Sequence, residues 1–299
     1  NAACPALCKV DAYVFATKVI QRVPGDAKND RGLSKQLFDL AMAEWPAAIA
    51  TPGVPDREIG QLLDSLLAQA KSLGIADERA NRLILGPLLK QNRAIGDYHE
   101  GLRFIALALD SRGYGPASDV SAVRMQAMER YAAQAGQCFR KAWLKDPTNP
   151  GPAVHMIQVE ILLPTGRAAM EMWYQRAIGA DPDNIEARDA KLAYLEPQWY
   201  GSYEDMIALG RECLATQNWD GRIPQLLVSI HRLIARQTGA GGKYFADPAV
   251  WKDVQDVYEG MIKHDPADAP THNMYAYLAA VSGHQEIARR ELAIVGDRP

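Results

Sequence analysis

Histidine and cysteine are the side chains of this chain best suited to metal binding or nucleophilic chemistry. The six histidines are His99, His155, His231, His264, His272 and His284. None of them belongs to a His-Glu-x-x-His helix, and no Cys/His set has the spacing of a zinc site. Three of them, His264, His272 and His284, fall in one hairpin region, but a turn position suits His264 and His284 as capping residues. The sequence therefore predicts no metal and no cofactor.

A glycine-rich segment, Thr238–Lys243, has the composition of a phosphate-binding loop. That loop requires a glycine five residues before its Gly-Lys pair and a Ser or Thr after the lysine. Gln237 and Tyr244 occupy these two positions, and a helix rather than a strand precedes them. The segment is therefore interpreted as a loop between helices.

Acids and serines show no motif of an active site either. No Gly-x-Ser-x-Gly turn occurs, and the acidic pair Glu204-Asp205 stands where a helix begins, which the helix dipole accounts for. A catalytic pair of carboxylates like that of a glycosidase stays an alternative, because its two residues need not be neighbours in the sequence. We predict no catalytic residue, and we expect a binding protein rather than an enzyme.

The most distinctive cluster is aromatic. Pro197, Trp199, Tyr200 and Tyr203 fall within seven residues of one another. Trp and Tyr dominate binding hot spots, so this segment could contact a ligand or a partner protein. Because aromatic side chains bury large areas, the segment could equally pack back onto the protein. Trp199, Tyr200 and Tyr203 are the candidate binding residues.

Composition excludes several classes of partner. The 299 residues carry a formal net charge of −3, with 33 basic and 36 acidic residues mixed along the chain. No run of Lys and Arg forms the basic footprint of a nucleic-acid-binding protein. No stretch approaches the roughly 20 apolar residues that span a bilayer. We therefore expect a protein or peptide partner, no nucleic acid and no membrane insertion.

The cysteines and the first residues bear on the compartment. Cys4 and Cys8 lie four residues apart and could form a local disulfide or belong to a frayed terminus, whereas Cys138 and Cys213 sit in apolar helical contexts. The chain starts Asn-Ala-Ala-Cys without a Met, which fits the removal of a leader peptide. These features favour a periplasmic or secreted protein over a cytoplasmic one.

Helical periodicity recurs along almost the whole chain. The clearest stripe follows the i, i+3, i+4, i+7 pattern and consists of Ile59, Leu62, Leu63, Leu66, Leu67, Ala70 and Leu73. In the N-terminal third the pattern predicts helices at 11–22, 34–49, 57–73, 77–93 and 97–110. A comparable signal for strands is nearly absent. The fold class is therefore all-α.

Three helices are predicted to end at an Asp-Pro pair, because proline pushes the residue before it out of the helical region. The pairs are Asp146-Pro147, Asp181-Pro182 and Asp265-Pro266. The first two are 35 residues apart, close to the 34-residue period of tetratricopeptide repeats. A large aromatic precedes each proline by eight residues: Phe139, Tyr174 and Tyr258.

This pattern resembles the second-helix half of a tetratricopeptide repeat. A fourth hairpin is predicted at 271–281 and 285–295, whereas 197–203 and 237–248 interrupt the period. We expect a tetratricopeptide-like helical-hairpin solenoid with an irregular N-terminal helical part. The glycines and Pro116 within 111–118 place the predicted boundary between an N-terminal helical region, 1–115, and a repeat region, 116–299, although one continuous solenoid could hold both.

The segment Tyr194–Leu209, YLEPQWYGSYEDMIAL, resembles the sequence pattern of an uncharacterised bacterial family, domain of unknown function 4034. A second matching piece contains Trp251, Tyr258 and Pro266, and the resemblance covers roughly 125–296. Tyr200 stands where that pattern has glycine. The resemblance implies a tetratricopeptide-like fold and no established activity.

These observations favour a non-catalytic protein–protein interaction scaffold. Two alternatives stay open: a hydrolase on a helical scaffold, and an immunity-type partner of a secreted toxin. The partner's identity and the oligomeric state do not follow from the sequence.

Overall fold

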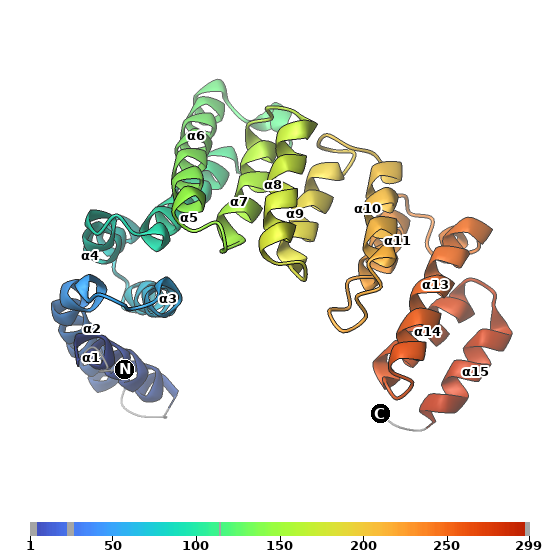
Figure 1. Cartoon of the computed structure of the whole chain (residues 1–299), viewed down its shortest axis with the longest axis horizontal. Coiled ribbons are helices and arrows are strands. Elements are labelled where there is room, and N and C mark those ends of the chain that lie inside the picture. Colours follow the sequence, from blue (N-terminus) through green and yellow to red (C-terminus); the bar gives the residue numbers. More distant parts are fainter. Residues whose placement is uncertain (1–4, 23–26, 114, 297–299) are drawn as a thin grey trace. The chain divides into compact units, whose positions relative to one another are not determined.

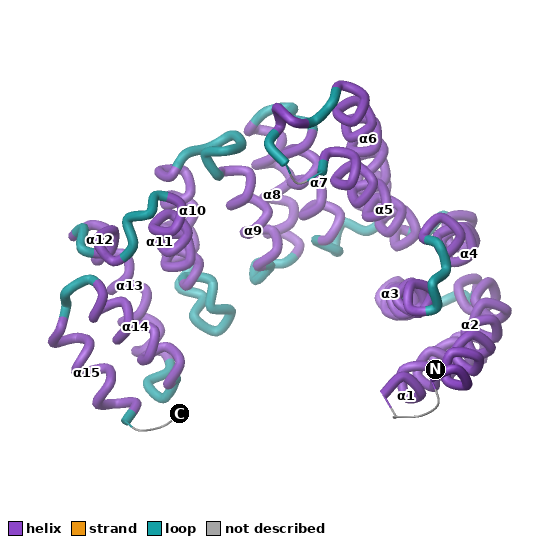
Figure 2. Tube along the Cα trace, turned by 180° about the vertical axis from the view of Figure 1, so that it is seen from behind, coloured by secondary structure: helices purple, strands orange, loops and turns teal. Residues whose placement is uncertain are grey.

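The structure is a computed structural model that describes residues 5–22, 27–113 and 115–296. Over these ranges its regular secondary structure is entirely helical, and Figure 2 shows helices and loops without a strand. The predicted all-α fold class is therefore confirmed. None of the helices in these ranges is long and apolar enough to cross a membrane.

The chain forms two compact units, residues 1–169 and residues 170–299. The predicted boundary at residues 115 and 116 lies inside the first unit, between its fifth and sixth helices. It separates regions of different sequence regularity and stays a prediction.

The regular elements of the first unit are the helices labelled α1 to α7 in Figure 1 and one short 3-10 helix. Its elements are α1 (Pro5–Arg22), α2 (Ala27–Ala50), α3 (Asp56–Ser72), α4 (Asp77–Lys90), α5 (Ala94–Arg112), η1 (Ala117–Asp119), α6 (Ala122–Lys145) and α7 (Gly151–Leu162). All five helices expected in the N-terminal third exist. The first begins earlier than expected, at Pro5, a residue that suits the first turn of a helix because it has no N–H to satisfy.

The second unit is also helical, and its first helix starts in the last residues of the first unit. Its elements are α8 (Arg167–Ala180), α9 (Ile185–Leu195), α10 (Tyr203–Ala215), α11 (Gln225–Gln237), α12 (Gly242–Phe245), α13 (Pro248–His264), α14 (Ala269–Val281) and α15 (Gln285–Val295). The last two match the hairpin expected at 271–281 and 285–295. The segment predicted as an interruption at 237–248 contains the single-turn helix α12.

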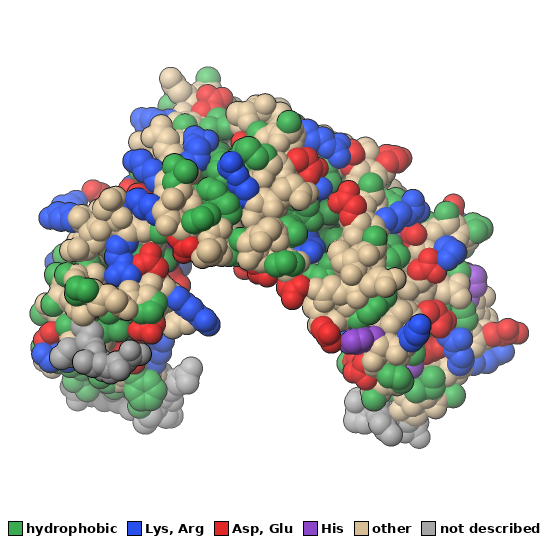
Figure 3. Space-filling model, viewed as in Figure 1, with side chains coloured by type: hydrophobic (Ala, Val, Ile, Leu, Met, Phe, Trp, Pro, Cys, Tyr) green, Lys and Arg blue, Asp and Glu red, His purple; other side chains and the backbone are tan. Residues whose placement is uncertain are grey.

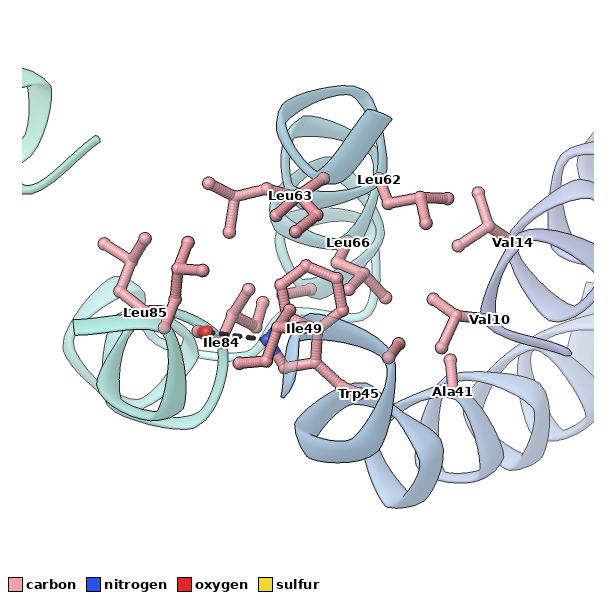
Figure 4. Close-up of a cluster of buried hydrophobic side chains, with 14 of the residues drawn as sticks. Val10, Val14, Ala41, Trp45, Ile49, Leu62, Leu63, Leu66, Ile84 and Leu85 are labelled. Atoms are coloured by element: carbon pink, nitrogen blue, oxygen red, sulfur yellow. Dashed lines mark hydrogen bonds between the residues drawn. The ribbon is translucent and has the colours of Figure 1, made fainter. Parts of the chain in front are cut away.

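Apolar side chains of α1, α2, α3 and α4 point toward one another in the core of the first unit (Figure 4). Trp45 lies at the centre of this cluster and is fully buried. Its indole Nε1 donates a hydrogen bond of 2.8 Å to the carbonyl oxygen of Ile84, which joins α2 to α4. The polar atom of the buried Trp45 ring therefore has a hydrogen-bond partner.

α5 and α6 approach closely because a glycine on α5 faces an aromatic ring on α6. A Cβ atom at Gly101 would lie 2.5 Å from the Phe139 ring, which is fully buried. A side chain larger than hydrogen would therefore separate the two helices. This close contact positions the surface of α5 that is described below.

In the second unit, stacked aromatic rings join α13 to α14. The Tyr275 ring lies between those of Trp251 and Tyr258, with centroid distances of 6.0 and 5.1 Å. At another crossing, Gly210 of α10 faces Leu227 of α11, whose Cα would lie 2.9 Å from a Cβ at Gly210. Large rings and small residues thus alternate in this core, as close packing requires.

The Asp-Pro pairs end helices as predicted. α6, α8 and α13 each stop at the residue before the aspartate. In all three turns the aspartate Oδ1 accepts a hydrogen bond of 3.0–3.1 Å from the backbone N–H two residues on, at Thr148, Asp183 and Ala267. This Asx turn gives the aspartate a structural role at the end of the helix.

Candidate functional site

The predicted aromatic site lies in residues 196–202, the loop between α9 and α10, called the aromatic loop below. Hydrogen bonds from Trp199 N to Glu196 O (2.8 Å) and from Tyr200 N to Tyr194 O (3.2 Å) fold it back onto the end of α9. A Cβ at Gly201 would lie 2.3 Å from the Leu195 carbonyl oxygen. The glycine that this turn requires is therefore Gly201, and position 200 accepts a tyrosine.

The structure brings two of the three predicted residues together. The Tyr200 ring lies 4.9 Å from that of Tyr194 and 6.5 Å from that of Trp199. Tyr200 is 40% exposed, whereas Trp199 and Tyr203 are half-buried. Tyr203 begins α10, where Ser202 caps the helix by accepting a hydrogen bond from Asp205 N. The loop therefore combines packed rings with a partly exposed aromatic surface.

The larger candidate site lies wholly in the first unit. A cavity of about 750 Å³ opens between α3, α4, α5 and the Tyr131 side chain of α6, and is called the first-unit groove below. Apolar residues form part of its walls, including Leu67, Leu85, Leu102 and Leu107. Its polar lining residues are Asp64, Lys71, Asp77, Glu78, Asn81, His99, Arg103, Asp110 and Tyr131.

Carboxylates exceed cations in this lining. Arg103 is already bound within its own helix, with Nε and Nη2 donating hydrogen bonds of 2.8 and 2.6 Å to Glu100. Its guanidinium also lies 4.2 Å from the centroid of the Phe104 ring. On the face drawn in Figure 3, positive and negative side chains are interspersed. The groove therefore has a local excess of negative charge.

His99 is the buried polar side chain of the groove. It is only 6% exposed, and it makes no hydrogen bond among the described residues. Burial, with a smaller contribution from nearby His155, lowers the pKa of His99 to about 4, so the imidazole is neutral at neutral pH. Its ring nitrogens are not among the fully buried, unpartnered polar atoms of the described residues, so a group in the groove can reach them.

Asp64 lies beside His99 in the lining of the groove. Its Oδ1 lies 3.7 Å from His99 Nδ1, which is too long for a hydrogen bond. Burial raises the pKa of Asp64, but its side chain is 71% exposed, so the carboxylate keeps much of its hydration. Although such a pair could form a salt bridge, desolvation of the imidazole outweighs attraction to a carboxylate that water screens.

Sequence reasoning missed this site, although α5 contains a signal for it. His99 takes a place in the apolar stripe that also contains Ile95, Leu102 and Ile105, and a histidine at such a position is buried when the helix packs. The sequence does not show that His99 lies next to Asp64, because Asp64 belongs to another helix. Only tertiary packing brings the two together.

The second unit contains a buried histidine with a full set of partners. His231 Nε2 lies 3.1 Å from Asp253 Oδ2, and His231 Nδ1 lies 2.9 Å from Tyr244 Oη. Arg211 donates hydrogen bonds of 2.9–3.2 Å to both oxygens of Asp253. Burial lowers the pKa of His231 and raises that of Tyr244 to about 12. A phenol that holds its proton this firmly is a poor nucleophile, so the group acts as a link between α10, α11, α12 and α13.

The three C-terminal histidines have separate roles. His264 is exposed, whereas the other two belong to packed parts of the last hairpins. Their partners are Asp220 for His264, Glu291 and the Pro266 carbonyl for His272, and the Trp251 ring for His284. Across the part of the chain that the structure describes, no three His, Cys, Asp or Glu side chains gather as a metal site requires.

Two other segments named from the sequence can also be located. Thr238–Lys243 connects α11 to α12 and runs into that short helix. The pairing considered for Cys4 and Cys8 involves Cys4, which lies outside the described residues. Cys138 and Cys213 are unpaired, and burial raises the pKa of each thiol, so neither is activated as a nucleophile.

No protein-family model matches the chain, and no curated protein matches it significantly. The resemblance of Tyr194–Leu209 to domain of unknown function 4034 therefore stays a prediction.

Proposed function

We propose that this chain is a non-catalytic protein-binding scaffold whose first-unit groove receives a segment of a partner protein. The observation that carries the proposal is the groove itself, a cavity of about 750 Å³ with a buried histidine that has no internal hydrogen bond. Its lining combines apolar side chains with polar groups that converge on the same space, a combination found in binding sites.

Stacked hairpins of the tetratricopeptide type are the architecture that suits this function. Three features support them: the recurring Asx turn at the Asp-Pro pairs, the buried aromatic eight residues before each proline, and close crossings at glycines. In such repeats one hairpin cannot bury its own apolar face, so neighbours share a core and leave a surface for a ligand.

Site-specific photocrosslinking in cells of the source organism tests the function. A benzophenone amino acid is placed at Ala68 of α3 or Ala106 of α5, which are exposed and line the groove. Matched controls carry it at Leu144 and Val123 of α6, which are 81% and 77% exposed and lie outside the groove lining. We expect one discrete crosslinked protein from the groove positions alone. The same products from all four positions, or none from Ala68 and Ala106, would contradict the proposal.

The aromatic loop is proposed as a second contact surface, in the other unit. A double variant, Trp199→Ala with Tyr203→Ala, tests it once circular dichroism has confirmed its helix content. Reduced recovery of the crosslinked partner with this variant would support a binding role for the loop. Unchanged recovery would assign Trp199 and Tyr203 to packing and leave the groove as the binding surface.

A further inference from the structure

Asp64 and His99 form a pair of polar groups that lie close together but do not bond to each other directly. Asp64 Oδ1 and His99 Nδ1 are 3.7 Å apart, beyond hydrogen-bond length. Because the two atoms do not bond directly, a third group beside them can bond to both. One donor nitrogen can lie about 2.9 Å from each of the two atoms.

Protonation decides which kind of group fits. The low pKa of His99 leaves its imidazole neutral, so one ring nitrogen is an acceptor at neutral pH. The largely exposed Asp64 carboxylate is an acceptor of negative charge. A cation bound here selects the tautomer with the proton on His99 Nε2, which leaves Nδ1 as an acceptor beside the charged Asp64 carboxylate.

We propose that the first-unit groove binds a partner segment carrying a lysine or arginine side chain, with its cationic group between Asp64 and His99. This inference rests on the proposed function and specifies the chemistry of its ligand. His99 supplies the less exposed end of the site, and Asp64 supplies the charge.

The remaining charges of the groove agree with this occupant. Asp77, Glu78 and Asp110 add negative charge along its lining, while the charge of Arg103 is compensated by Glu100. Lys71 is the other cation of the lining, and it lies two turns beyond Asp64 on α3, about 10 Å along the helix axis. An acidic segment would meet repulsion here, whereas a basic one is attracted.

Two peptides that differ only in charge provide the probe. One is N-acetyl-Ala-Ala-Arg-Ala-Ala-amide, and the other has citrulline, a neutral isostere, in place of arginine. Each is titrated into the full chain, and the imidazole nitrogen and carbon-bound proton signals of His99 are followed by nuclear magnetic resonance. These signals report contact at the buried end of the site, which a general attraction between charges does not reach.

A matched pair of variants separates the site from the overall charge. Asp64→Asn removes the proposed ligand carboxylate. Asp39→Asn makes the same change on α2, outside the groove, at an exposed residue whose partner is Lys35 of the same helix. Because both side chains are exposed, neither change removes core packing.

We expect the arginine peptide to shift the His99 signals saturably and the citrulline peptide to bind about tenfold more weakly. Asp64→Asn should weaken binding of the arginine peptide about tenfold, and Asp39→Asn less than about twofold. Equal binding of the two peptides, equal effects of the two variants, or His99 signals that do not move would each overturn the inference.

The two proposals fail in different ways. A partner crosslinked at Ala68 or Ala106, together with a negative peptide result, retains the protein-binding function and removes the cation site. The arginine peptide bound as expected, with no crosslinked partner, retains the cation site and removes the scaffold function.

Discussion

Acidification should destabilise the first unit through His99. The pKa of this buried imidazole is about 4 in the folded chain, against an ordinary value of 6.5. As the pH falls below 6.5 the unfolded chain takes up a proton that the folded chain refuses, so stability is lost progressively toward pH 4. The stabilising contribution of His99 is complete above pH 6.5, and protonation of His99 causes no further loss of stability below its folded pKa of about 4.

The magnitude follows from the difference between the two pKa values. A difference of about 2.5 corresponds to about 3 kcal/mol of unfolding free energy. About 2 kcal/mol of this is already lost at pH 5, where the unfolded histidine is almost fully protonated and the folded one is mostly neutral. Because His99 is 6% exposed, solvent screening reduces this figure little.

Urea unfolding of the full chain and of a His99→Gln variant measures the effect. Amide resonance signals from α3 and α5 report the first unit separately from the second. Since glutamine does not titrate, the stability advantage of the parent chain should fall by about 2 kcal/mol between pH 7 and pH 5. Other groups such as Asp64, whose raised pKa acts in the opposite direction, largely cancel in this difference.

Two results would refute the reasoning. One is a stability difference between the two chains that stays constant over this pH range. The other is a direct titration of the His99 ring signals with a pKa near 6.5, which would mean that water or a counter-charge reaches the imidazole.

Two further predictions concern the second unit. Burial lowers the pKa of His272, but its hydrogen bonds to Glu291 and to a backbone carbonyl outweigh burial and raise it. The contribution of His272 to stability should therefore be complete below pH 6.5 and should be lost as the pH rises through its pKa in the folded chain. Urea unfolding of a His272→Gln variant and of the parent chain tests this. The difference between their unfolding free energies should shrink at alkaline pH. Gly210→Ala should cost about 1–3 kcal/mol in thermal unfolding, because the new Cβ meets the backbone of Leu227. Gly179→Ala, with open space at its Cβ on α8, should instead stabilise by about 0.5–1 kcal/mol, and equal effects of the two changes would contradict the packing argument.

The sequence predicted the helices well where local signals decide them. Asp146, Asp181 and Asp265 end their helices because a following proline acts on the adjacent backbone, a constraint that needs no tertiary partner. The last hairpin was also predicted from a local signal, because its turn contains Gly283, which has a φ of 90°. The start of α1 was placed too late, because apolar periodicity begins only near residue 11, although Pro5 suits the first turn of a helix.

The first-unit groove could not be predicted from local signals. Asp64 and His99 are 35 positions apart, and each alone is an ordinary residue of an amphipathic helix. The link from His231 to Asp253 and Tyr244 was missed for the same reason. In contrast, the turn at Trp199 was visible, but its geometry depends on Gly201 lying against Leu195, which is a contact between backbone segments rather than a motif.

The order in which the helices pack bears on how the chain folds. α1 packs on α2, α5 on α6, α10 on α11 and α14 on α15, so the strongest contacts join segments that are neighbours in the sequence. Chains dominated by such local contacts fold quickly, because little loop entropy is lost before packing begins. The first unit can therefore assemble on the ribosome, helix pair by helix pair, before the second unit has been synthesised. Translation would then present a folded groove while the remaining helices are still emerging.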